Sequence, residues 1–373
     1  MSVKNEHNNL VRLGDYIEEV ALKVGTNNHI EISGINLEHG FIPTVADMNG
    51  IDTTKYKMVP VDCFACNLMH IGRDVKIPIA YNETEKDIAV SPAYYVFKIK
   101  ENKKDKILGS YLEMLITRDE FGRLAWFHTD SSIRGNLLVS ELCDILIPLP
   151  DIDIQQELVD TYNGLKALAE QNEALIKPLI EACQAYIVDC KKKYDEVELG
   201  GYIEESKEKN RELQFESKDA RGVYSNGTFG DTLANLEGSN LASYKIVRNG
   251  EFAYSNRINI GSIAQCNEGS VIVSPSYTVF RVKSNEIISK YLFILFRRKE
   301  FLRSTLFFAI GTIKDDFSYE RMSEVKIPKP PIEVQQAIVN LYNCAEEAKK
   351  IANEAREKMK TLCPALVQKA LNG

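Results

Sequence analysis

Ile-Pro-Leu-Pro-Asp-Ile-Asp-Ile-Gln-Gln at positions 147–156 returns as Ile-Pro-Lys-Pro-Pro-Ile-Glu-Val-Gln-Gln at positions 327–336. The first stretch contains two prolines and the second three, and in both an acidic residue and then a pair of glutamines follow. An acidic side chain near a helix start is favoured by the positive end of the helix dipole, and proline suits a first helical turn. The two stretches therefore predict the beginnings of two helices, in two copies of one unit.

The sequence on either side repeats in the same order. Residues 11–19, VRLGDYIEE, return as 197–205, VELGGYIEE, and residues 88–100, IAVSPAYYVFKIK, return as 271–283, VIVSPSYTVFRVK. A period of about 180 residues is too long for a solenoid and indicates duplicated domains. We expect a first domain over 1–150 with a helix over 151–196, and a second domain over 197–330 with a helix over 331–373.

Composition excludes several classes of protein. The 373 residues are 44% hydrophobic and 27% charged, which is typical of a folded soluble chain and not of a disordered one. No apolar run approaches the ~20 residues that span a bilayer. Eight cysteines without a dense framework, and a polar N-terminus, favour a reduced cytoplasmic protein. The net charge of −7 argues against a nucleic-acid partner, yet positions 245–326 hold 13 basic and eight acidic side chains.

Each copy begins with short β-type runs and ends in a long helix, which predicts an α+β fold with two duplicated α/β domains. In both helices apolar residues recur in steps of four and three, the spacing of a left-handed coiled coil. The alternative is that each helix packs only on its own domain. Pro178 and Pro364 interrupt this spacing and should kink each helix or start a short terminal one. The residues expected to pack between the helices are Leu158, Leu165, Asn172, Leu175, Ile338, Ala345, Ala352 and Met359.

No motif in the sequence carries convincing catalytic chemistry. The tetrapeptides Ser-Pro-Ala-Tyr at 91–94 and Ser-Pro-Ser-Tyr at 274–277 faintly resemble a methyltransferase motif, but we interpret them as shared structure. Cys63 and Cys66 have the spacing of a redox or zinc pair, but zinc needs four ligands and no second pair follows. We expect two buried structural cysteines, no bound metal and no cofactor on this chain.

Two matched polar segments in each copy are candidates for binding. Residues 67–76 and 256–262 precede the Ser-Pro strands, and residues 132–136 and 312–316 precede the long helices. Their side chains are of the kinds that pair with base edges and phosphates, although each could be an ordinary solvated loop residue. The candidate DNA-binding residues are Asn67, His70, Arg73, Lys76, Arg134, Asn136, Asn256, Arg257, Asn259, Lys314 and Asp316.

The chain resembles the specificity subunit of a Type I restriction-modification enzyme. The resemblance rests on the Leu-Gly openings at 13–14 and 199–200, the two proline and glutamine stretches, and the closing residues 364–373, and it covers nearly the whole chain. It implies two target-recognition domains that read a split DNA sequence, and two antiparallel helices that hold them apart. It also implies two methyltransferase subunits that bind S-adenosylmethionine, and a motor-nuclease subunit that can join them.

We therefore predict a non-catalytic DNA-recognition subunit that directs methyltransferase and restriction subunits to a bipartite site. One alternative is the equivalent subunit of a bifunctional enzyme whose partner chain carries both methylase and nuclease. Others are an enzyme that uses Cys63 and Cys66, and a coiled-coil scaffold that binds only proteins.

Overall fold

The computed structural model is an α+β protein whose chain divides into two compact units. One unit contains Met1–Glu170 with Ala352–Gly373, and the other contains Gln171–Ile351. Each unit holds one copy of the repeat, the start of one long helix and the end of the other. The structure describes residues 10–26, 30–44, 50–69, 76–130, 135–232, 234–256, 262–267, 269–308 and 317–372, of which 362–372 by backbone alone.

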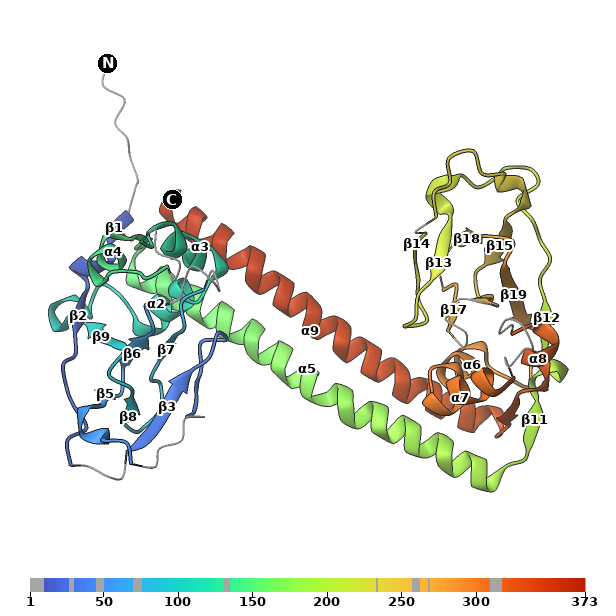
Figure 1. Cartoon of the computed structure of the whole chain (residues 1–373), viewed down its shortest axis with the longest axis horizontal. Coiled ribbons are helices and arrows are strands. Elements are labelled where there is room, and N and C mark those ends of the chain that lie inside the picture. Colours follow the sequence, from blue (N-terminus) through green and yellow to red (C-terminus); the bar gives the residue numbers. More distant parts are fainter. Residues whose placement is uncertain are drawn as a thin grey trace, which may run out of the picture. The chain divides into compact units, whose positions relative to one another are not determined.

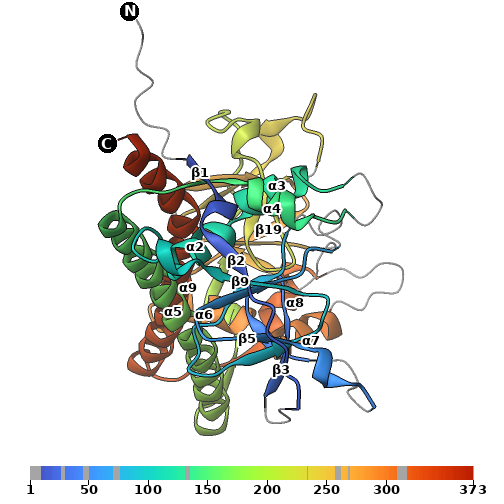
Figure 2. The ribbon, with the colours of Figure 1, turned by 90° about the vertical axis from the view of Figure 1, so that its left-hand side faces the viewer.

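The first domain contains two four-stranded sheets and a strand pair (Figures 1 and 2). In order of pairing, the antiparallel sheet is β2 (Ile17–Glu19), β9 (Tyr95–Ile99), β6 (Cys63–Cys66) and β7 (Ile79–Tyr81). The second sheet is β4 (Phe41–Pro43), β3 (Glu31–Ile35), β8 (Ile88–Val90) and β5 (Lys57–Val59), and β1 (Leu10–Arg12) pairs with β10 (Leu146–Pro148). The helices are α2 (Gly109–Ile116), α3 (Asp119–Phe127), α4 (Val139–Asp144) and α5 (Ile152–Lys193).

The second domain repeats these elements in the same order along the chain, which confirms the predicted duplication. Its antiparallel sheet is β12 (Ile203–Glu205), β19 (Tyr277–Val282), β16 (Phe252–Ser255) and β17 (Ile263–Gln265). Its strand pairs are β13 (Arg221–Val223) with β14 (Phe229–Asp231), β15 (Lys245–Arg248) with β18 (Ser270–Val273), and β11 (Glu196–Glu198) with β20 (Lys326–Pro328). The helices are α6 (Ser289–Phe296), α7 (Lys299–Phe308), α8 (Tyr319–Glu324) and α9 (Ile332–Asn372).

Alternate residues of the central strands pack on different layers. In β6, Phe64 and Cys66 face the helices, where Phe64 stacks on Phe97 with ring centroids 5.0 Å apart. Cys63 and Ala65 face the second sheet. This is the period-two pattern of a strand buried on both faces. Each domain therefore has three layers: the helices, the antiparallel sheet and a smaller β layer. The smaller β layer is the β4–β3–β8–β5 sheet in the first domain and the pairs β13–β14 and β15–β18 in the second.

This alternation also decides the chemistry of the two cysteines. Cys63 and Cys66 lie in different cores, on opposite faces of β6, so their spacing does not bring the sulfurs together. Burial raises the pKa of the Cys63 thiol to about 11, and it raises that of Cys66 further. Thiols held in the neutral form are poor nucleophiles and poor metal ligands. Both are buried core residues, as predicted.

The repeated Leu-Gly openings are explained by a close approach of two backbones. Leu13 and Leu199 are buried, and each begins a short 3-10 helix after the first strand of its domain. A Cβ atom on Gly14 would lie 2.7 Å from Cβ of Cys143, and one on Gly200 would lie 2.7 Å from Cβ of Ser323. Only glycine fits this contact with α4 or α8, which is why it stands at both positions.

The repeated glutamines secure the starts of the long helices. Gln155 is fully buried, its Nε2 donates to the carbonyls of Lys106 and Pro150 at 2.8 Å each, and its Oε1 accepts from the Leu108 N–H at 3.0 Å. All the hydrogen-bonding groups of a buried amide are thus satisfied.

Gln335 makes the same three bonds in the second domain. It donates to the carbonyls of Glu286 and Pro330 at 2.9 Å each and accepts from the Ile288 N–H at 2.9 Å. The neighbouring Gln156 is exposed and bonds only to Asp160, one turn further along α5. The first glutamine of each pair is therefore the one that ties helix to domain.

In each unit, the start of one long helix and the end of the other run alongside one another (Figures 1 and 2). In the second unit the Cys183 Sγ lies 3.8 Å from the Ile338 carbonyl oxygen, and both residues belong to the core of that domain. Neither proline ends its helix, because α5 continues through Pro178 and α9 through Pro364. The other expectation, a kink at each proline, stays a prediction. Within the described residues, no helix is both long and apolar enough to cross a membrane.

The buried face of α9 follows the predicted spacing, whereas that of α5 departs from it. Ile338, Ala345 and Ala352 are buried and Met359 is half-buried. In α5, Leu158 is buried in the domain core, and Leu165 and Asn172 are half-buried. Leu175 is 52% exposed, and the buried face passes instead through Ala169, Ile176, Cys183 and Ile187. The expected packing of Leu175 is wrong, because Ala169, Ile176 and Cys183 keep the seven-residue spacing but lie one residue after the expected positions.

The glutamine contacts predict a large difference between two neighbouring positions. Gln155→Ala leaves two carbonyls and one N–H without partners in a buried place. It should lower the free energy of unfolding by about 2–4 kcal/mol, measured by chemical denaturation of the full chain. Gln156→Ala, the matched control, should change it by less than about 0.5 kcal/mol. Equal effects of the two substitutions would contradict the assigned role of Gln155.

A half-buried carboxyl on α2 predicts a pH dependence of stability. Burial, and then the nearby charge of Glu83, raise the pKa of Glu113 from 4.5 to about 7. The folded state therefore binds this proton more tightly than the unfolded state does. Stability from this group is fully present below pH 4.5 and is lost as the pH rises through about 7.

The variant Glu113→Gln should remove that loss. At about pH 8 it should unfold with a free energy roughly 1–3 kcal/mol above that of the unmodified chain, and at about pH 4 with the same free energy. Glu83→Gln should give a smaller gain of the same sign, because it removes only the neighbouring charge. A Glu113→Gln variant that is no more stable at the higher pH would show that this carboxyl is not strained.

Candidate nucleic-acid interface

In each domain, described residues that border the two predicted polar segments are joined by a hydrogen bond. In the first domain the connection from β6 to β7 and the connection from α3 to α4 are joined by a backbone hydrogen bond, from the Leu137 N–H to the Leu68 carbonyl at 2.9 Å. In the second domain the Phe317 N–H donates to the Asn256 carbonyl at 3.0 Å, between the corresponding connections. Described residues about 60 to 70 positions apart in sequence, at the borders of these segments, are thus in contact in each domain.

Four of the candidate DNA-binding residues belong to the described part of the chain. They are Asn67, Lys76, Asn136 and Asn256. The others lie outside the described residues, and their roles stay predictions: His70, Arg73, Arg134, Arg257, Asn259, Lys314 and Asp316.

The three described asparagines begin or close these connections. The Oδ1 atom of Asn67 accepts from the Met69 N–H at 3.0 Å, and that of Asn256 accepts from the Thr278 hydroxyl at 2.7 Å. Asn136 donates its backbone N–H to Asp130, and its own Oδ1 is buried without a partner among the described residues. In Asn67 and Asn256 the carbonyl end is thus engaged within the domain, which leaves the amide nitrogen as the donor for a ligand.

Lys76 is less available as a cation than its sequence suggests. Its ammonium lies 3.3 Å from the carboxylate of Asp119, at the start of α3. His39 stands close by with its Nδ1 3.3 Å from the Ile79 carbonyl, and burial lowers its pKa. A DNA phosphate would have to compete with Asp119 for Lys76.

The Ser-Pro-x-Tyr tetrapeptides are structural, as predicted. The ammonium of Lys57 donates to the Tyr94 carbonyl at 2.8 Å, and Lys245 donates to the Tyr277 carbonyl at 2.6 Å. Each tyrosine hydroxyl accepts a backbone N–H from the smaller β layer, at 3.4 Å in both domains. The motif therefore joins layers within the domain.

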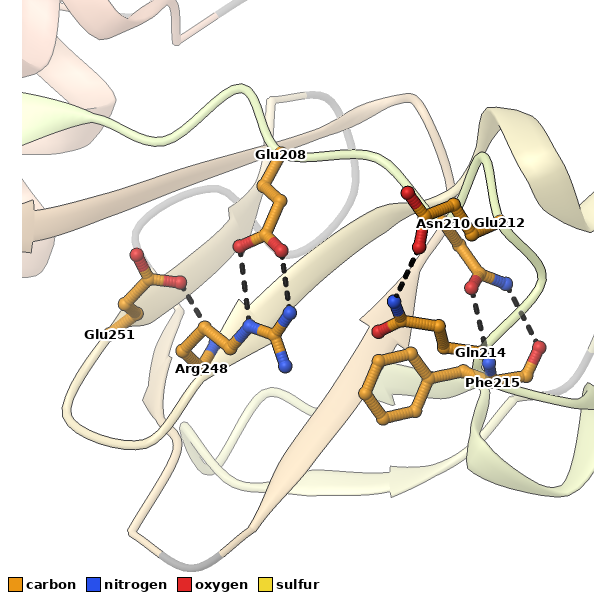
Figure 3. A network of polar contacts seen from close by, with 7 residues as sticks. All are labelled: Glu208, Asn210, Glu212, Gln214, Phe215, Arg248 and Glu251. Atoms are coloured by element: carbon orange, nitrogen blue, oxygen red, sulfur yellow. Dashed lines mark hydrogen bonds and ion pairs between the residues drawn. The ribbon is translucent and has the colours of Figure 1, made fainter.

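Part of the basic excess in the second domain is also used internally (Figure 3). Arg248 lies in β15, and its guanidinium donates to both carboxylate oxygens of Glu208 at 2.5 and 3.2 Å while its backbone N–H donates to Glu251 at 2.8 Å. Its guanidinium also lies over the ring of Phe215. The side chain of Asn210 makes two hydrogen bonds with the backbone of Phe215 (Figure 3). Arg248 stabilises the segment after β12 and is not a free cation.

Comparisons with known proteins agree with this arrangement. Residues 191–353 match the family model described as the Type I restriction modification DNA specificity domain. The S subunit of a Type I restriction-modification system from M. genitalium shares the fold over 99% of this chain and 98% of that chain, with a TM-score of 0.61 at 11% identity. An HsdS subunit from Thermoanaerobacter tengcongensis aligns over 100% of this chain and 98% of that one, with a TM-score of 0.42 at 16% identity. The comparison with curated proteins finds no match.

The family match covers the second domain with parts of both long helices, and the first domain repeats the same strands, helices and glutamine contacts. Residues 191–353 therefore belong to the DNA specificity domain family of Type I restriction-modification systems, and the first half of the chain repeats the elements of this domain.

Proposed function

We propose that each domain reads one half of a bipartite DNA target, and that the chain directs methyltransferase subunits to that target. The observation that supports this is the duplication of the paired connections. Two domains of one topology carry equivalent surfaces, one joined through Leu68 and Leu137 and the other through Asn256 and Phe317. Their side chains differ, as two readers of different half-sequences require.

The rest of the activity then belongs to partner chains. We infer that two methyltransferase subunits bind S-adenosylmethionine and modify adenine, and that motor-nuclease subunits can join the complex. This chain would bind no cofactor, because its own contribution is to place the complex on DNA. The retained framework of helix starts and Leu-Gly contacts in both domains favours equivalent attachment of two identical subunits.

Mapping methylated adenines tests the proposal directly. The chain would be expressed with its partner methyltransferase, and the methylated positions in the host DNA would be sequenced. The expected result is a motif with two specified parts and an unspecified middle. A continuous motif, or no methylation by a complex that assembles, would contradict the proposal and favour a scaffold that binds only proteins.

Exchange of one domain gives a separate prediction. If residues 1–150 are replaced by the first domain of a relative with a different target, only one half of the methylated motif should change. The reason is that the glutamine contact lies between each domain and the helix that follows it, so each reader is attached independently. Loss of both half-specificities in a complex that still assembles would show that the domains do not read separately.

A further inference from the structure

Most cations of the basic stretch 245–326 that the structure describes already have partners. Arg248, Arg281 and Arg298 pair with carboxylates, and Lys245 and Lys283 donate to backbone carbonyls. Arg297 and Lys299 differ from these, since no carboxylate in the described part of the chain lies within ion-pair distance of either. Two adjacent exposed cations without counter-charges are a candidate site for an anion.

Arg297 and Lys299 line a cleft of about 180 Å³ in the second domain. One side is the junction between α6 and α7. The other side is the turn between β13 and β14, with Ser225, Asn226 and Gly227, and the floor includes Ser262. Ser262 belongs to the β16–β17 connection and donates its hydroxyl to the Ser225 carbonyl at 3.2 Å. The cleft thus includes one described residue of a connection predicted to contact DNA.

The turn beside the cleft is closed by hydrogen bonds and presents a hydrogen-bond donor. The Oδ1 atom of Asn226 accepts from both the N–H and the hydroxyl of Thr228, at 3.1 and 2.6 Å, which leaves its amide nitrogen to donate. Gly227 has a φ of +70°, and a Cβ there would lie 2.6 Å from Nη1 of Arg297. The absence of a side chain at Gly227 therefore lets the guanidinium lie against the turn.

The two cations are held in different ways. The Arg297 guanidinium lies 5.8 Å from the ring centroid of Phe293, which limits its movement. Between the two, Arg298 turns inward, with a side chain only 9% exposed and paired with Glu300 at 3.4 Å. Lys299 is the first residue of α7, where the helix dipole adds to the positive potential.

We propose that this cleft binds a backbone phosphate of DNA in the half-site read by the second domain. The inference rests on the proposed function and adds a site to it. A guanidinium, an ammonium and an amide nitrogen around a cleft of this size suit a phosphodiester oxygen pair, and they carry no information about base sequence. The contact positions the domain on the duplex.

The first domain lacks the corresponding charges. At the positions 180 residues earlier stand Thr117 and Asp119, and Asp119 holds Lys76 in an ion pair. The phosphate contact is therefore specific to the second domain. The phosphate contact of the second domain therefore differs from any contact that both domains make.

The test measures how DNA affinity depends on salt, with the full chain in its methyltransferase complex and a random-sequence duplex as the probe. Arg297→Gln should lower the slope of log affinity against log salt by about 0.9, the value for one phosphate contact. At about 0.1 M salt this corresponds to roughly five- to tenfold weaker binding. Lys299→Gln should act in the same direction. The matched control is Arg303→Gln, which removes an exposed cation of α7 outside the cleft, 75% exposed, and should leave the slope unchanged.

Ethylation of single phosphates locates the contact. With the unmodified chain, ethylation at one phosphate on the second-domain side should interfere with binding to the mapped target, and with Arg297→Gln that interference should disappear. A slope in Arg297→Gln equal to that in Arg303→Gln would overturn the proposal. Binding of inorganic phosphate to the unmodified chain and to Arg297→Gln is measured in parallel. If the substitution abolishes phosphate binding without changing the slope, the cleft holds only free anions and the proposal is also overturned. If the unmodified complex has no preferred DNA site, the proposed function itself fails, and a salt slope still reduced by Arg297→Gln would leave the phosphate site standing.

Discussion

A buried glutamine at the root of each long helix is the contact on which the architecture depends. An amide that loses water is costly unless each of its polar atoms finds a partner, and Gln155 and Gln335 each find three, all on backbone atoms. Backbone partners at three points fix both the position and the rotation of the first helical turn relative to its domain. Helices of 42 and 41 residues would otherwise amplify any freedom at that turn. Because both copies make this contact, each domain is attached in the same way to the long helix that follows it.

Much of this framework could be predicted from sequence because the two copies of the repeat can be compared with each other. The repeats located both helix starts, the Leu-Gly openings and the structural nature of the Ser-Pro-x-Tyr motif. The partners of Gln155 could not be predicted, since Lys106 and Leu108 lie almost 50 residues away and contribute backbone atoms, which carry no sequence signal. The buried face of α5 was misplaced at Leu175 for a different reason. A heptad count assumes one partner along the whole helix, whereas the first turns of α5 pack on a domain core.

The candidate site could be predicted from the sequence only in part. Composition and position indicated the polar connections, but their contact through Leu68 and Leu137 comes from the fold and not from any pattern. Lys76 looked like a free cation because its partner, Asp119, is 43 residues away in sequence. Arg297 was missed although a signal existed, a run of three basic residues at 297–299. Its importance became visible only when the fold placed Arg297 and Lys299 against a turn at 225–227, while Arg298 pairs with Glu300.

The net charge of −7 is compatible with DNA binding because charges act over short distances. At physiological salt the screening length is about 8 Å, so acidic side chains elsewhere on the chain are largely screened from a phosphate at the cleft. What matters is whether a cation has a local counter-charge, and this differs between the domains. In the first, Asp119 pairs with Lys76, while in the second no carboxylate among the described residues pairs with Arg297 or Lys299. Phosphate contacts hold a reader in register and base contacts give it selectivity. Two domains with one framework can therefore divide these tasks unequally, with the second supplying more of the affinity.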